Sequence, residues 1–149
     1  MKLNLGKKEK SEVVTMLQNV PIFSALPKKE LNTMAESFVE RSYPAGTVIE
    51  TEGEKGVSFY LVVEGAVDVR KGTKTIAKLS RGQFFGELSL LDREPRSASI
   101  ITTQPTKCLV MTAWVWTAFL ETQPKLAMPV MRELARRLRE TDKALSLQN

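Results

Sequence analysis

The pattern of apolar and polar residues changes its period twice along the chain. From about residue 11 to 39, apolar residues recur at helical spacing in runs that Pro21 and Pro27 interrupt. Between 43 and 111 the apolar residues are mostly β-branched or aromatic and stand in short runs separated by glycines. After residue 112 the helical period returns. The order of helices, strands and helices predicts an α+β fold.

The central segment predicts an antiparallel β-roll or jelly-roll barrel. Its glycines stand at turn-like intervals, and the polar run Arg70–Lys74 predicts the tip of a hairpin. Several short strands joined by regular glycine turns favour such an architecture. The expected strands include Val48-Ile49, Phe59–Val63, Ala66–Val69 and Thr75–Ala77.

Two helices are expected at the C-terminal end. The first covers Ala113 to Thr122 and stops near Pro124. The second runs from about Pro129 to Leu145, because proline is acceptable in a first turn, where its missing N–H would be unpaired anyway. We therefore expect a basic tail at 1–10 and one domain at 11–149, with the β-roll at about 43–111 and the C-terminal helices at about 113–145.

Composition narrows the range of functions. The chain has 149 residues, which is enough for one domain with a real core. It contains no histidine, so imidazole is excluded as a catalytic base or metal ligand. Its single cysteine, Cys108, excludes an internal disulfide and any cysteine cluster for a metal. We expect no metal site.

The formal charge of +5 is concentrated at the two ends. Residues 1–10 carry four lysines against one glutamate, and residues 125–149 carry six basic residues against three acidic ones. Such ends support at most non-specific, salt-sensitive attraction to nucleic acid. The N-terminus lacks the apolar core of a secretory signal, and the longest apolar stretch, 111–120, is too short to span a bilayer. We expect a cytoplasmic protein.

One segment, residues 84–99, interrupts the strand pattern and carries the candidate chemistry. Gly86 leads into a helix start, whose unpaired N–H groups can bind a phosphate. Arg96 returns on a polar loop and offers a planar, permanently charged fork for phosphate oxygens. Glu87 has the wrong charge for a phosphate but suits a sugar hydroxyl. Together these residues describe a pocket for a small sugar phosphate, although each fragment alone also fits an ordinary helix start or loop.

The same residues resemble the phosphate-binding cassette of cyclic nucleotide-binding domains, the family of catabolite activator proteins and protein kinase A regulatory subunits. The resemblance covers roughly residues 15–143 and implies a β-roll that binds a cyclic nucleoside monophosphate. It is carried by FGELSLL at 85–91 and PRSAS at 95–99, and by PIFSAL at 21–26, YPAGTVI at 43–49 and YLVVEGAVDV at 60–69.

The resemblance implies a role for each cassette residue. Glu87 would accept the ribose 2′-hydroxyl, and Arg96 would pair with the cyclic phosphate. The phosphate cradle would be completed by the amides of Leu88, Ser89 and Ala98 and the hydroxyl of Ser97, with Gly86 allowing close backbone approach. Val69 and Ile76 would line the apolar wall against the purine, although both positions also fit plain core.

The residue after the cassette arginine bears on the choice of base. In the family, alanine there goes with cyclic AMP and threonine often with cyclic GMP. This chain has Ser97, whose hydroxyl could reach a guanine amino group or serve only the phosphate. Serine also occurs there in bacterial regulators that bind cyclic AMP, so we expect cyclic AMP to be favoured over cyclic GMP.

The last helix carries a heptad seam. Two interpretations stand: a helix packed on its own roll with a solvated charged face, or a helix that pairs with its twin in a homodimer and lies over the nucleotide. The stretch 135–141 resembles the long helix of catabolite activator proteins, which implies that Thr141 contacts adenine across the dimer interface. The seam consists of Met131, Leu134, Leu138, Thr141 and Leu145, spaced 3, 4, 3, 4.

Three kinds of function remain open at this point. The chain could be a receptor that acts on an effector protein, a regulatory fragment of a larger channel, kinase or transcription factor, or a domain that no longer binds nucleotide. Activators of the family carry a DNA-binding domain after this helix, whereas this sequence ends at Asn149, so we expect no sequence-specific DNA binding. A phosphodiesterase needs a metal-held water or a comparable activator, for which no candidate set exists, so we expect neither an enzyme nor a cofactor.

Overall fold

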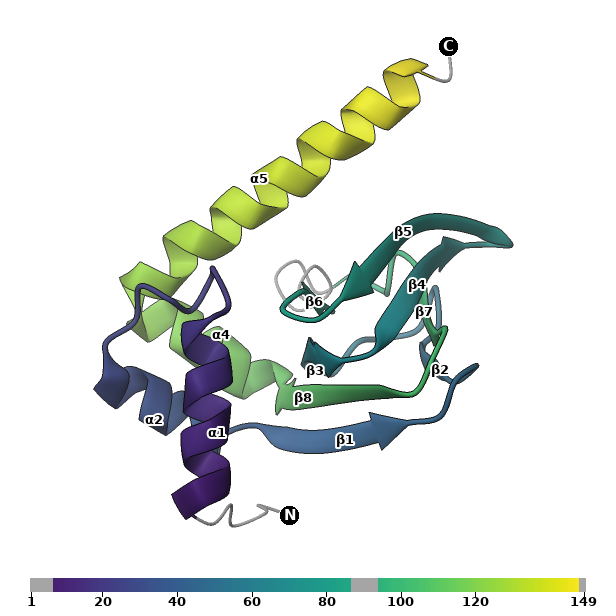
Figure 1. Ribbon diagram of the computed structural model, residues 1–149. Helices are drawn as coiled ribbons and strands as arrows, with labels where there is room; N and C mark the ends of the chain where they lie inside the picture. Colours follow the sequence, from purple (N-terminus) through teal and green to yellow (C-terminus); the bar gives the residue numbers. More distant parts are fainter. Residues whose placement is uncertain (1–6, 87–93, 148–149) are drawn as a thin grey trace.

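Two antiparallel four-stranded sheets form a β-roll with helices gathered at one end (Figure 1). The computed structural model describes residues 7–86 and 94–147. One sheet has the order β1-β8-β3-β6 and the other the order β2-β7-β4-β5. The strands are β1 (Val39–Tyr43), β2 (Val48–Glu50), β3 (Ser58–Glu64), β4 (Ala66–Lys71), β5 (Lys74–Ser80), β6 (Phe84–Phe85), β7 (Ser99–Thr102) and β8 (Thr106–Thr112).

Along the sequence, helices come both before and after the strands of the roll. The N-terminal pair precedes β1 and the C-terminal pair follows β8, so the predicted α+β architecture is confirmed. None of the helices within the described ranges is long and apolar enough to cross a membrane. The helices are α1 (Lys7–Gln18), α2 (Lys28–Glu36), α4 (Ala113–Thr122) and α5 (Pro124–Leu147).

The core has two parts. In the first, which joins the helices to the β1-β8-β3-β6 sheet, the fully buried Trp116 stacks on Phe59 with ring centroids 4.0 Å apart. The second lies between the two sheets and includes Val62, Val67 and Cys108. Burial raises the pKa of the Cys108 thiol to about 12, so this cysteine stays protonated at neutral pH.

Local signals predicted some element boundaries and missed others. Helix α1 begins at Lys7, inside the predicted tail at 1–10, and β1 begins at Val39, before the predicted start of the roll at about 43. Helix α4 has the predicted bounds, and Gly72, at φ +58°, turns the chain between β4 and β5 as expected. The predicted start of the last helix at Pro129 is wrong, because α5 begins at Pro124 and Pro129 lies inside it. Pro124 takes the first helical position without losing a hydrogen bond, and the fully buried Leu126 anchors this turn on the core.

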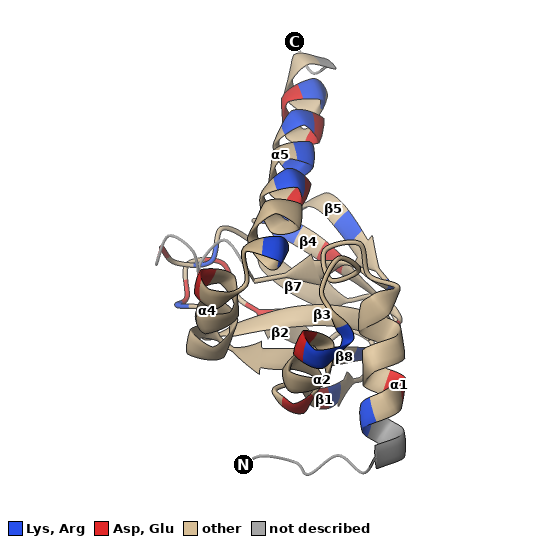
Figure 2. Cartoon of the chain, turned by 90° about the vertical axis from the view of Figure 1, so that its left-hand side faces the viewer, with Lys and Arg blue, Asp and Glu red and all other residues tan. Residues whose placement is uncertain are grey.

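Helix α5 starts on the core and then runs away from the roll (Figure 1). Leu126 and Val130 are buried, whereas Leu138 and Leu145 are 63% and 56% exposed. Figure 2 shows basic and acidic residues distributed along α5 toward its end. From residue 138 to 146 every residue of α5 is exposed.

Candidate functional site

The backbone of Arg96 is fixed against the loop between β2 and β3. Its N–H donates to the carbonyl of Glu54 at 2.8 Å, and its carbonyl accepts from the N–H of Gly53 at 2.9 Å. Nearby, the Ser99 hydroxyl at the start of β7 accepts from the N–H of Glu52 at 2.9 Å. The pairing of β2 with β7 continues in these contacts, so the position of Arg96 follows from the roll itself.

The guanidinium of Arg96 is buried in a polar cluster. The residue is 6% exposed, its Nη1 donates to the carbonyl of Gly86 at 2.5 Å, and its Nη2 donates to the carbonyl of Ser58 at 2.9 Å. The same Nη2 lies 2.8 Å from Oε1 of Glu50, whose side chain is 6% exposed. A buried cation needs such partners, because burial removes its hydration.

Two glycines make room for this cluster. Gly86 has φ +93°, and a Cβ there would lie 2.6 Å from the Ser58 carbonyl oxygen. A Cβ on Gly56 would lie 2.0 Å from Cζ of Arg96, so the guanidinium is in contact with the bare backbone of Gly56. A side chain at either position would displace the arginine or the strand beside it.

Aromatic hydroxyls near the cluster remain neutral. Burial raises the pKa of Tyr60, and the negative charge of Glu50 raises it further, while Arg96 lowers it. Burial also raises the pKa of Tyr43, to about 12. The ring of Tyr60 stacks on Phe85, with ring centroids 4.7 Å apart. At neutral pH these two hydroxyls therefore add no charge beside Arg96 and Glu50.

The structure brings some of the residues expected from the sequence together and leaves others apart. Gly86 and Arg96 are in direct contact, with Ala98 buried and Ser97 exposed just after the arginine. Glu87, Leu88 and Ser89 lie outside the described residues. Position 98 directly precedes β7, which pairs with β4.

The positions assigned to the base pocket differ in exposure. Val69 is half-buried on β4, where it pairs with Ile100 of β7, whereas Ile76 on β5 is 51% exposed. Thr141 is exposed, and its hydroxyl donates to the Arg137 carbonyl in its own helix at 3.0 Å. Within one chain, Thr141 is therefore not brought to the cluster around Arg96.

Three members of the cluster were not identified from the sequence. Glu50 had a signal, since it is a charged residue directly after the apolar pair Val48-Ile49 of a predicted strand. Gly56 is one of the glycines at turn-like intervals in the sequence. In the structure it must be a glycine because the Arg96 guanidinium lies against it. Ser58 contributes a backbone carbonyl, which no residue type reveals.

Helix α5 touches the strand that leads into the cassette segment. Nη2 of Arg137 donates to the carbonyl of Phe84 at 2.7 Å, and its Cζ lies 4.4 Å from the centroid of the Phe84 ring. Phe84 in turn lies against Phe59, with ring centroids 5.5 Å apart. The middle of α5 is thus attached to β6, two residues before Gly86.

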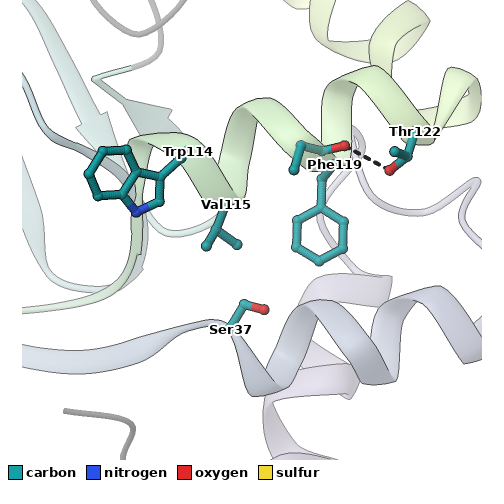
Figure 3. Close-up of a pocket in the computed structure, with 6 residues that line it drawn as sticks. Ser37, Trp114, Val115, Phe119 and Thr122 are labelled. Atoms are coloured by element: carbon teal, nitrogen blue, oxygen red, sulfur yellow. Dashed lines mark hydrogen bonds between the residues drawn. The ribbon is translucent and has the colours of Figure 1, made fainter.

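A separate hollow of about 270 Å³ lies beside α4 (Figure 3). Val115 and Phe119 point from α4 toward Ser37 across it, and Trp114 at its end is 80% exposed. None of the described residues that line it is charged. The described residues that line this hollow therefore offer no charge to a phosphate.

Comparison with known proteins places the cluster inside a recognised domain. The family model described as cyclic nucleotide-binding domain matches residues 40–123, which include Glu50, Gly86 and Arg96. A crystal structure of a cyclic nucleotide-binding domain from Methylobacillus flagellatus matches with a TM-score of 0.80 and 26% identity, over 95% of this chain and 85% of that one.

Two curated relatives extend the match. A cyclic AMP receptor protein from Thermus thermophilus is 35% identical over 136 residues, which cover 88% of this chain and 63% of that protein. A cAMP-dependent protein kinase regulatory subunit from Mycosarcoma maydis is 40% identical over 88 residues, which cover 56% of this chain and 17% of that protein. The chain thus spans less than two thirds of either relative.

Proposed function

The chain belongs to the cyclic nucleotide-binding domain family, and on that premise we propose that it binds a cyclic nucleoside monophosphate as a regulatory or sensor module. The observation that carries the proposal is the buried guanidinium of Arg96, held against Gly86 within the matched span. An arginine in a site with little water can bind a phosphate through charge-assisted hydrogen bonds, which are stronger than neutral ones.

In the proposed complex, Arg96 pairs with the cyclic phosphate. The Ser97 hydroxyl and the Ala98 amide follow it directly and complete one side of the phosphate cradle. The amides of Leu88 and Ser89 form the other side, and Glu87 accepts the ribose 2′-hydroxyl. Gly86 supports this arrangement because its backbone carries no side chain that would keep the nucleotide away.

We propose cyclic AMP as the favoured ligand over cyclic GMP. The names of the Thermus and Mycosarcoma relatives support this choice, since both refer to cyclic AMP. Val69 and Ile76 supply apolar surface on β4 and β5 for the purine, and the exposure of Ile76 leaves its side chain accessible to a base. Ser97 is the residue at which a guanine amino group would gain a hydrogen bond.

We further propose that α5 pairs with the same helix of a second copy. Met131, Leu138 and Leu145 are 54%, 63% and 56% exposed, and their heptad spacing places them on one face. Thr141 belongs to the same seam, so in a dimer it would face the partner and the nucleotide rather than solvent. Sedimentation with and without cyclic AMP tests this, and a monomer in both conditions would contradict it.

The proposed activity is binding without turnover, with the signal passed to an effector protein or to neighbouring domains of a larger chain. Incubation with cyclic AMP followed by chromatography should recover the unchanged cyclic nucleotide. Appearance of 5′-AMP in proportion to protein concentration would contradict the proposal and indicate a phosphodiesterase.

Calorimetric titration with cyclic AMP and cyclic GMP side by side tests the binding function. Linear 5′-AMP serves as the matched control, because it carries the same base without the cyclic phosphate. We expect cyclic AMP to bind more tightly than cyclic GMP, and 5′-AMP to bind weakly. Tighter binding of cyclic GMP would overturn only the choice of base. If the folded protein binds neither cyclic nucleotide, the domain has kept the fold and lost the function.

A further inference from the structure

We propose that Glu50 competes with the nucleotide phosphate for Arg96 and thereby lowers and sets the affinity of the site. This inference rests on the proposed function, since it concerns the same arginine. Oε1 of Glu50 lies 2.8 Å from Nη2 of Arg96, and the two side chains are 6% and 5% exposed. The ligand therefore meets an arginine that is already paired with an internal anion.

The geometry of the guanidinium makes the competition direct. A planar guanidinium offers paired N–H groups on two edges, Nη1 with Nη2 and Nε with Nη2, so a two-point grip on phosphate always uses Nη2. In this structure Nη2 donates to the Ser58 carbonyl and also contacts Glu50. A phosphate that approaches Nη2 by either edge must therefore share it with these two partners or displace one of them.

Of the two partners, Glu50 is the one that can move. The Ser58 carbonyl belongs to the backbone of β3, where Ser58 is paired with Thr112 of β8. The carboxylate of Glu50 stands at the end of a flexible side chain at the last residue of β2, next to an irregularity in the pairing of β2 with β7. Side-chain rotation of Glu50 is therefore the easier way to free Nη2.

Electrostatic repulsion also favours competition between Glu50 and the phosphate. A carboxylate and a phosphate that share one guanidinium repel each other, and the repulsion is stronger in a buried site than in water. Without ligand, Glu50 supplies the negative charge that a buried arginine requires. If Glu50 only positions Arg96, its removal weakens nucleotide binding, whereas if it competes, its removal strengthens binding.

The test is calorimetric titration of the wild type, Glu50→Gln and Glu54→Gln with cyclic AMP and cyclic GMP. Glutamine keeps the size of the side chain and an acceptor oxygen but removes the charge. We expect Glu50→Gln to bind roughly ten- to a hundredfold more tightly than the wild type. Glu54→Gln removes the same charge from an exposed residue of the neighbouring loop and should stay within about twofold.

The outcomes separate this proposal from the proposed function. If the wild type binds and Glu50→Gln binds equally or more weakly, the competition is overturned and the binding function stands. If neither binds although both are folded by circular dichroism, both proposals fall. Glu50→Asp decides the matter if Glu50→Gln does not fold, because a shortened carboxylate should loosen the pair and raise the affinity by a smaller factor. An unchanged or lower affinity of Glu50→Asp would then overturn the competition.

Discussion

The cluster around Arg96 and the outer half of α5 both contain arginine and glutamate, but their surroundings differ. The side chains of Arg96 and Glu50 are 5% and 6% exposed, whereas Arg136 is 48% exposed between Glu133 and Glu140. An exposed ion pair contributes about 0–1 kcal/mol, while removing one partner of a buried pair costs about 3–5 kcal/mol. The ion pair of the roll is therefore costly to break, whereas the charges of α5 mainly keep a long helix solvated.

Arg96→Ala should give the largest effect. It removes the proposed phosphate contact and leaves Glu50 buried without this partner, so cyclic AMP binding should weaken by about 2–5 kcal/mol. Calorimetry measures the loss, with Arg136→Ala as a control that should bind like the wild type. Near wild-type affinity of Arg96→Ala for both cyclic nucleotides would show that the phosphate binds elsewhere.

Gly86→Ala should destabilise the roll by about 2–4 kcal/mol, since it combines a positive φ with a clash against the Ser58 carbonyl. Gly82→Ala is the matched control. Gly82 also has positive φ, at +86°, but a Cβ there meets nothing within 4 Å, so its cost should be about 1–2 kcal/mol. Urea unfolding of both variants measures the difference. Equal losses of unfolding free energy would show that the clash with the Ser58 carbonyl oxygen contributes nothing.

Arg137→Met tests the contact between the two regions. It removes the hydrogen bond to the Phe84 carbonyl and the cation–π contact with the Phe84 ring, and should reduce the free energy of unfolding by about 1–2 kcal/mol. Arg136→Met, one residue earlier and more exposed, should cost less than about 1 kcal/mol. If the two variants are equally stable in thermal unfolding, the attachment of α5 to β6 contributes little.

Leu138→Ser should have the smallest effect on the folded domain and a clear effect on assembly. Leu138 is 63% exposed, so the free energy of unfolding of a single chain should change by less than about 0.5 kcal/mol. If α5 forms the proposed dimer seam, sedimentation should show weaker self-association than in the wild type. Unchanged association would place the dimer contact elsewhere.

The sequence predicted elements well where local signals agree. Helix α4 shows helical periodicity and ends just before Pro124, and the hairpin between β4 and β5 has a glycine at its turn. The predicted start of α5 is wrong because Pro124 and Pro129 both suit the first turn of a helix. Only the burial of Leu126 in the tertiary core decides between Pro124 and Pro129.

The candidate site was predictable as a motif but not as an arrangement. Arg96 and Gly86 stand out because phosphate chemistry favours an arginine and a glycine-led helix start. The partners of Arg96 come from β2 and β3, about 40 residues earlier, and depend on how β2 pairs with β7. No spacing rule relates Glu50 to Arg96, so their pairing could be learned only from the fold.

Pro129 makes α5 easier to bend at one point along its length. A proline inside a helix has no N–H to donate to the carbonyl four residues earlier, so the helix is weakest against bending at that point. From Pro129 to Leu147 the helix rises about 27 Å at roughly 1.5 Å per residue, so a bend of about 10° moves its end by about 5 Å. A bend at Pro129 would therefore displace the far end of α5 much more than its start, where Leu126 is buried in the core.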